Sequence, residues 1–144
     1  MVESIASILK RQGHRVHSVG LDDTVREAIS KMAAEHVAAV LVFDGKRLAG
    51  IVSAKDYGNR VILEGRSGRD TRVREIMSSP VVTVAVEASV LECLAIMGHH
   101  KIRHLPVFGN GELLGVVSMG VLVHAVIEDQ AFKIDQLMTY VGQK

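Results

Sequence analysis

The chain has 144 residues, which is enough for one compact domain or for two closely joined half-domains. Its formal net charge is only +1, whereas general nucleic-acid binders are usually strongly basic, so the charge argues against that class. Apolar residues make up 48% of the chain and aromatic residues only 3%, so we expect a core of aliphatic side chains, Ala and Met.

The sequence shows no targeting or membrane segment. The first residues lack the basic region and long apolar run of a signal peptide. The longest apolar stretch, Leu113 to Ile127, is shorter than the ~20 residues that a membrane span needs, and it contains His124. The single cysteine, Cys93, cannot form an internal disulfide, which fits a reducing compartment. We therefore expect a cytoplasmic protein.

The segment 1–64 predicts a helix followed by a β-α-β-β-α unit. In the helix, over 3–12, Ile5, Ile8 and Leu9 share one face, and Gly13 follows its last turn. Thr24 and Glu27 form a capping box at the start of the next helix. The expected strands cover 16–19, 37–43 and 47–53, with a turn at Asp44-Gly45 and a last helix over about 56–64.

The segment 65–78 predicts a polar linker with a helical turn at 73–77. A second β-α-β-β-α unit follows over 79–129, and its helix starts at the capping box of Ser89 and Glu92. Its expected strands cover 81–84, 102–108 and 113–118, with a turn at Asn110-Gly111 and Cys93 on the buried face of the helix. A tail helix is expected over 130–144. Its apolar face should dock on its own module or on a partner chain, and consists of Ile134, Leu137, Met138 and Val141.

The two units are an internal repeat. The segment 15–63 aligns with 80–128 without a gap, and the alignment places Gly50-Ile51-Val52-Ser53 on Gly115-Val116-Val117-Ser118. Each of these four-residue frames is typical of the end of a strand that runs into the start of a helix. Unpaired N–H groups at such a helix start attract anions. In the first repeat Asp56 follows, and its carboxylate could bind the two hydroxyls of a ribose. The second repeat has Val121 at that position.

The ordered set of motifs resembles a tandem pair of cystathionine-β-synthase (CBS) domains, also called a Bateman module, and in particular the small stand-alone bacterial members. The motifs are the two Gly-h-h-Ser frames (h, apolar), Val-Val-Thr-Val at 81–84, Ile-Arg-His-Leu-Pro-Val at 102–107 and the Asp-Tyr at 56–57. The resemblance implies an α+β fold with two repeats packed with pseudo-twofold symmetry. It also implies two clefts for adenosine-containing ligands and assembly into a flat, disk-like homodimer.

Carried over residue by residue, the resemblance implies one good nucleotide site. Asp56 would accept both ribose hydroxyls, and Ser53 and Lys55 would face the sugar and the phosphate. Ala38 and Ala39 would leave room for the base. The second repeat would supply Val82 and Thr83 beside the adenine and Arg103 and His104 at the phosphate. Arginine offers a fork suited to two oxygens.

The second cleft departs from the family pattern, because Val121 cannot replace the ribose-binding carboxylate. A lost charged contact of roughly 1.5–3 kcal/mol means about 10- to 150-fold weaker binding of ribose. We therefore expect one principal nucleotide per chain. Ser118, Arg103 and His104 would still allow phosphate to bind in the second cleft.

Several of these residues also have plain structural interpretations. Asp56 could be only a helix cap, Ser53 and Ser118 could simply end strands, and Arg103 could form a surface ion pair. The linker arginines at 66, 69, 72 and 74 suit a solvated segment, with a phosphate contact from Arg66 or Arg69 as the alternative.

The sequence argues against a metal site, a Rossmann site and catalysis. His100 and His104 have the i, i+4 spacing of one helical face, but the helix is expected to end near Lys101, and no acidic or cysteine cluster accompanies them. Gly109-Asn110-Gly111 lies in a hairpin rather than between a strand and a helix, so it is not a dinucleotide fingerprint. No nucleophile with a base and an orienting partner is recognisable.

The sequence thus predicts a regulatory module that senses AMP, ADP, ATP or NAD(H) between its two repeats and signals to a partner protein that it does not identify. It predicts no catalytic activity, no required cofactor, no metal and no membrane or nucleic-acid partner. The alternative is a dimerisation or interaction scaffold with vestigial clefts. Val121 favours the scaffold, and the intact Asp56 favours the sensor.

Overall fold

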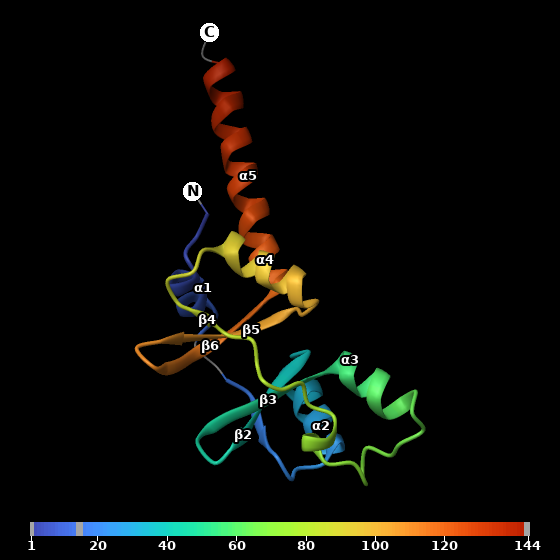
Figure 1. The fold of residues 1–144 in the computed structure, drawn as a ribbon. Helices are drawn as coiled ribbons and strands as arrows, with labels where there is room; N and C mark the ends of the chain where they lie inside the picture. The colour runs from blue at the N-terminus through green and yellow to red at the C-terminus, as the bar shows by residue number, and fades with distance from the viewer. Residues whose placement is uncertain (1, 14–15, 143–144) are drawn as a thin grey trace. The chain divides into compact units, whose positions relative to one another are not determined.

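The computed structural model describes residues 2–13 and 16–142. It contains two three-stranded sheets, each accompanied by helices (Figure 1). The chain divides into two units. One unit comprises residues 16–81, and the other joins the N-terminal segment to the part of the chain from residue 82 onward. The predicted α+β class is confirmed.

The unit of residues 16–81 has the sheet order β1-β2-β3. Strand β1 runs parallel to β2, and β2 runs antiparallel to β3. Its elements are β1 (Ser18–Gly20), α2 (Val25–Glu35), β2 (Ala39–Asp44), β3 (Arg47–Ser53), α3 (Ala54–Tyr57), the π-helix η1 (Gly58–Ile62) and the 3-10 helix η2 (Val73–Glu75). Thr24 caps α2, because its side chain accepts the N–H of Glu27 at 3.1 Å.

The other unit has the sheet order β4-β5-β6, again with a parallel and then an antiparallel pair. Its elements are α1 (Ile5–Gln12), β4 (Val84–Ala85), α4 (Val90–His100), β5 (His104–Gly109), β6 (Glu112–Ser118) and α5 (Met119–Gly142). The predicted capping box is present, because Glu92 N–H donates to Ser89 Oγ at 3.0 Å and Ser89 N–H donates to Glu92 Oε1 at 3.4 Å.

The predicted repeat is confirmed in the backbone. When 15–63 is aligned with 80–128, α2, β2 and β3 coincide with α4, β5 and β6 at both ends. The bulge between Val42 and Phe43 recurs between Val107 and Phe108. Both helices end in a left-handed residue, at φ 56° in the first repeat and φ 55° in the second.

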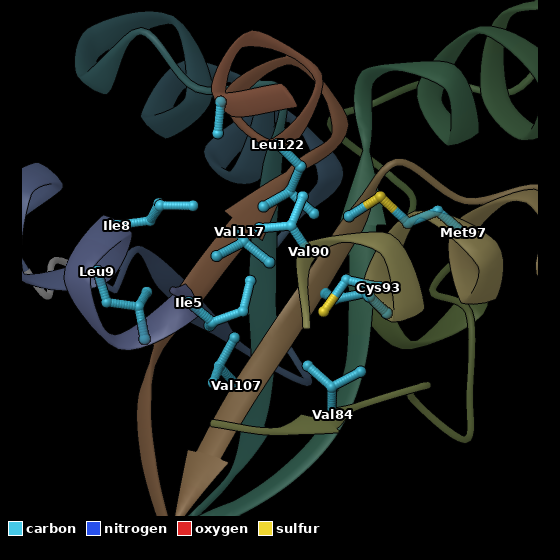
Figure 2. Packing of buried hydrophobic residues seen from close by; sticks show 12 residues of the cluster. Ile5, Ile8, Leu9, Val84, Val90, Cys93, Met97, Val107, Val117 and Leu122 are labelled. Carbon is cyan, nitrogen blue, oxygen red and sulfur yellow. The ribbon is translucent and has the colours of Figure 1, made fainter. Parts of the chain in front are cut away.

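Helix α1 packs with the second repeat, which corrects its assignment to the first unit over 1–64. Figure 2 shows Ile5, Ile8 and Leu9 turned towards Val107 and Val117 of the β5–β6 sheet. The three α1 side chains are fully buried. The amphipathic pattern predicts which face of α1 is apolar, but it does not say which sheet that face covers. A further contact comes from Gln12 Nε2, which donates to the carbonyl of Val116 at 2.8 Å.

The segment 65–78 is a fixed part of the first unit rather than only a linker. Val73 and Ile76 are fully buried in its core. Ser78 exchanges two backbone hydrogen bonds with Ile51, at 2.9 and 3.1 Å. A Cβ atom on Gly50 would lie only 2.5 Å from Sδ of Met77, so the glycine of the Gly-h-h-Ser frame allows this close approach.

Three predicted elements differ from the observed ones. Strand 81–84 shrinks to β4, because strand pairing with β5 begins only at Val84. The helix expected over 56–64 begins at Ala54 and turns into a π-helix, in which Leu63 N–H bonds to the carbonyl of Gly58 at 3.0 Å. No separate tail helix exists over 130–142, because α5 continues unbroken from Met119. Residues 143 and 144 of that tail lie outside the described residues.

Among residues 2–13 and 16–142, no helix is long and apolar enough to cross a membrane.

Candidate functional site

The carboxylate of Asp56 lies in a capping box at the junction of β3 and α3. Its Oδ2 atom accepts the N–H of Ser53 at 2.9 Å and the hydroxyl of Ser53 at 3.1 Å, and Asp56 N–H donates back to Ser53 Oγ at 3.2 Å. The helix-cap interpretation of Asp56 is therefore correct for Oδ2. The other oxygen, Oδ1, accepts no hydrogen bond from any residue that the structure describes. One half of the carboxylate thus fixes the side chain and the other half is available to a ligand.

The first set of predicted site residues gathers at one edge of the β1-β2-β3 sheet. Ala39, at the start of β2, pairs with Ser53 at the end of β3. The carbonyl of Ala38 accepts Ala54 N–H at 3.0 Å. Lys55 lies on the first turn of α3, with an exposed side chain. Ala38, Ala39, Ser53, Lys55 and Asp56 are therefore brought together within one unit.

The second set gathers at the equivalent edge of the β4-β5-β6 sheet. His104 pairs with Ser118, and the carbonyl of Arg103 accepts Met119 N–H at 2.8 Å. Val82 and Thr83 precede β4, which runs parallel to β5, so they lie at the end of the sheet where β5 begins. Each set occupies the end of its own sheet. A ligand that contacts both sets stays a prediction.

The second set lacks the carboxylate, as the sequence indicates. Val121 N–H donates to Ser118 Oγ at 3.3 Å, so half of the capping box survives. The valine side chain cannot return a hydrogen bond, and it packs partly buried against the core of this unit. The unit can therefore present hydroxyl, guanidinium and imidazole groups to a ligand, but no acceptor for ribose at this position.

Burial and the positive charge of Arg103 both act on His104 in the second set. Burial, and then the positive charge of Arg103, lower the pKa of His104 below its ordinary value. At neutral pH His104 is therefore an uncharged imidazole that offers one donor and one acceptor. Among the described residues the exposed guanidinium of Arg103 has no ion-pair partner, so the alternative interpretation of Arg103 as part of a surface ion pair is not observed. Arg103 supplies a permanent positive charge at this edge.

Two residues of the first repeat were overlooked as candidates. His17 and Ser18 correspond to Val82 and Thr83 when the two repeats are aligned. The carbonyl of His17 accepts Leu41 N–H at 2.9 Å, which places His17 at the sheet end that carries Ala39. The repeat itself is the signal that could have identified them, because a residue named in one half has an equivalent in the other.

The other chemically notable residues have structural roles. Burial raises the pKa of the Cys93 thiol, and the nearby Glu92 raises it further, so the thiol is protonated at neutral pH. Within the part of the chain that the structure describes, no three His, Cys, Asp or Glu side chains are placed to hold a metal ion. Helix α4 ends at His100, so His100 and His104 do not share a helical face.

Comparisons with known proteins agree with this architecture. The CBS domain family matches residues 5–57 and 73–128. The mitochondrial CBS domain-containing protein CBSX3 of Arabidopsis thaliana is 32% identical over 147 residues, which is 96% of this chain and 71% of that protein. YhcV of Bacillus subtilis, also a CBS domain-containing protein, is 30% identical over 116 residues, covering 81% of this chain and 82% of that protein.

A solved structure of a protein with CBS domains from Burkholderia ambifaria MC40-6 superimposes with a TM-score of 0.85. It is 44% identical, over 89% of this chain and 96% of that one. The two matched ranges, the repeated β-α-β-β-α backbone and this likeness together show that the chain belongs to the CBS domain family, as a CBS pair of the kind that serves as a regulatory module.

Proposed function

We propose that this CBS pair is a sensor of adenine nucleotides, with AMP, ADP, ATP or NAD(H) as candidate ligands. The observation that carries the proposal is the carboxylate of Asp56, which is held through Oδ2 while Oδ1 remains without a partner among the described residues. A pre-positioned acceptor loses little freedom when it binds a ribose hydroxyl. Arg103 and His104 are the proposed phosphate-binding residues, and Val82 and Thr83 the proposed neighbours of adenine.

The proposed regulation depends on coupling between nucleotide binding and the conformation of the protein. A nucleotide can shift the arrangement of the two repeats only by its differential affinity for the alternative arrangements. A ligand at about one hundred times its Kd stabilises the bound state by about 2.7 kcal/mol. Such a shift is large enough to change how the protein binds a downstream partner. No catalytic step is needed, and we expect no turnover of the nucleotide.

Titration calorimetry with AMP, ATP and NAD(H) tests the sensor. We expect at least one of them to bind with close to one ligand per chain, because only the first repeat carries the ribose-binding carboxylate. The melting temperature should rise with the same ligand. Product analysis of the same mixtures checks that the nucleotide is unchanged. If none of the three ligands binds, the sensor proposal fails, and conversion of the nucleotide would contradict a purely regulatory role.

The C-terminal half of α5 favours a second function, dimerisation. The apolar face predicted to dock is exposed, so within the described residues it does not pack on its own module. Ile127, Ile134, Met138 and Val141 are each 58 to 67% exposed. With Ala131 they alternate steps of four and three along the helix, the heptad pattern by which identical helices pair. We propose a second copy of the chain as the occupant of this seam.

Charge placement favours a parallel arrangement of the two helices. Glu128 and Asp135 flank the seam on the same side, so an antiparallel pair would bring carboxylates of the two copies against each other. In a parallel pair Glu128 would instead face Val123, and Asp135 would face Gln130. The parallel arrangement therefore avoids repulsion between like charges.

Replacing Ile134 with Glu should weaken self-association at this seam, because the change places a charge in its centre. Gln136→Glu is the matched control, since it adds the same charge on the opposite side of α5. Sedimentation velocity should show the wild type and the control as dimers, with the Ile134→Glu variant shifted towards monomer. A dimer that survives Ile134→Glu would contradict the seam. If association is lost while no nucleotide binds the wild type, the scaffold function is supported over the sensor.

A further inference from the structure

A hollow of about 430 Å³ lies within the unit of residues 16–81, beside Tyr57, the residue that follows Asp56 on α3. Its polar lining comes from α2, α3 and the segment that follows η1, and consists of Arg26, Ser30, Tyr57, Ser67 and Arg69. Of the residues that the sequence offers for nucleotide binding, only Arg69, named there as an alternative phosphate contact, lines it. Its volume lies within the range of about 300–1,000 Å³ of small-molecule sites.

The two arginines of this hollow have uncompensated charge. Neither Arg26 nor Arg69 forms a side-chain ion pair or hydrogen bond with any residue in 2–13 or 16–142. The nearby arginines are occupied. Two of them form ion pairs, Arg66 with Glu75 and Arg74 with Asp22. The side chains of the other two donate to backbone carbonyls, Arg72 to that of Asp22 and Arg60 to that of Ile76. Of the linker arginines expected to be solvated, Arg69 alone keeps its guanidinium free of partners among the described residues.

The backbone holds the two arginines at the same hollow. Arg26 N–H donates to the carbonyl of Gly68 at 3.0 Å, and Val25 N–H donates to the carbonyl of Thr71 at 2.9 Å. The segment around Arg69 is thereby anchored on the first turn of α2. Arg69 N–H donates to Ser67 Oγ at 3.2 Å, so the hydroxyl hydrogen of Ser67 remains available to a ligand. The site is thus built by tertiary contacts between segments that are distant in the sequence.

We propose that this hollow binds a phosphate-bearing anion. Two guanidinium groups offer forks of N–H donors that match the oxygens of a phosphoryl group, and the hydroxyls of Ser30, Ser67 and Tyr57 can donate to the same oxygens. No carboxylate lines the hollow, so an anion meets no like charge there. The anion can be free pyrophosphate or the polyphosphate tail of a nucleotide. The site does not rest on ribose recognition by Asp56.

Calorimetry with inorganic pyrophosphate, AMP and ATP tests this site. The double variant Arg26→Gln/Arg69→Gln should lose about tenfold or more of the pyrophosphate affinity of the wild type. The matched control is Lys46→Gln/Arg47→Gln, which removes the same charge at the exposed β2–β3 turn and should change the affinity less than twofold. A Ser30→Glu variant keeps both arginines, adds a negative charge to the hollow and should show a comparable loss.

The titrations with AMP and ATP show whether the bound phosphate is a free anion or part of a nucleotide. If the double variant weakens ATP but not AMP, the site takes the tail of a nucleotide, whereas loss of pyrophosphate binding alone indicates the free anion. The proposal is overturned if pyrophosphate does not bind the wild type, or if Arg103→Gln abolishes its binding while the double variant retains it. Asp56→Asn removes a negative charge near the hollow and should not weaken pyrophosphate binding, so failure of the nucleotide sensor and failure of this site give different results.

Discussion

Replacing Asp56 with Asn should weaken the binding of AMP by about 10- to 150-fold. The carboxylate is a charged acceptor, and losing such a hydrogen bond costs roughly 1.5–3 kcal/mol. Asn still has a side-chain oxygen that can accept Ser53 N–H, which Asp56 Oδ2 now accepts at 2.9 Å. The substitution therefore removes the charge and one acceptor with little change to the start of α3. Calorimetric titration of wild type and variant at the same salt concentration measures the difference.

Because Asp56 is also a capping residue, the experiment needs a control for loss of the cap. Glu92→Gln changes a different capping box, at the start of α4, where Glu92 accepts Ser89 N–H. Glu92 is exposed and is not one of the predicted nucleotide residues. Both variants should lower the melting temperature slightly and similarly, and only Asp56→Asn should reduce the affinity. Equal affinity of Asp56→Asn and wild type for AMP would show that Asp56 is only a cap.

Replacing Leu9 with Ala should lower the free energy of unfolding by about 2–5 kcal/mol, the usual cost of truncating a buried leucine. Leu9 is fully buried, and with Ile5 and Ile8 it covers the β5–β6 sheet (Figure 2). The cost should fall on the unit that contains β4, β5 and β6. Urea denaturation measures its size, and amide hydrogen exchange shows which unit loses protection.

Leu63→Ala is the matched control, because the same side chain is removed where it is 78% exposed. Its unfolding free energy should stay within about 0.5 kcal/mol of wild type, as for most surface substitutions. Faster exchange in β2 and β3 than in β5 and β6 after Leu9→Ala would contradict the placement of α1. An effect confined to β5 and β6 would show that the N-terminal helix belongs energetically to the second repeat.

Local signals in the sequence were sufficient for most of the fold. The capping residues Thr24 and Ser89 each mark the residue before the observed helix, because an N-cap satisfies N–H groups of the same turn. Gly45, Asn110 and Gly111 mark the observed turns, because their positive φ angles are tolerated by few other residues. The alignment of the two repeats then carries each assignment from one half to the other.

The candidate site was only partly predictable. The difference between Asp56 and Val121 is visible in the sequence, and with it the expectation of one ribose-binding half. That Oδ2 is occupied by Ser53 and Oδ1 is not depends on the geometry of the capping box. The pKa of His104 depends likewise on burial and on Arg103, and neither effect follows from residue order.

The order of residues along the chain was thus enough to establish the repeat, the capped helices, the hairpin turns and the family, because each depends on close neighbours in the chain or on the repeated pattern. The folded chain was needed to show that α1 joins the second repeat and that α5 is continuous. It was also needed to show that Arg26 and Arg69 have no side-chain partner among the described residues, whereas Arg66 and Arg74 form ion pairs. These features depend on contacts between distant segments, where an apolar face or a positive charge can meet any of several partners and only packing selects one.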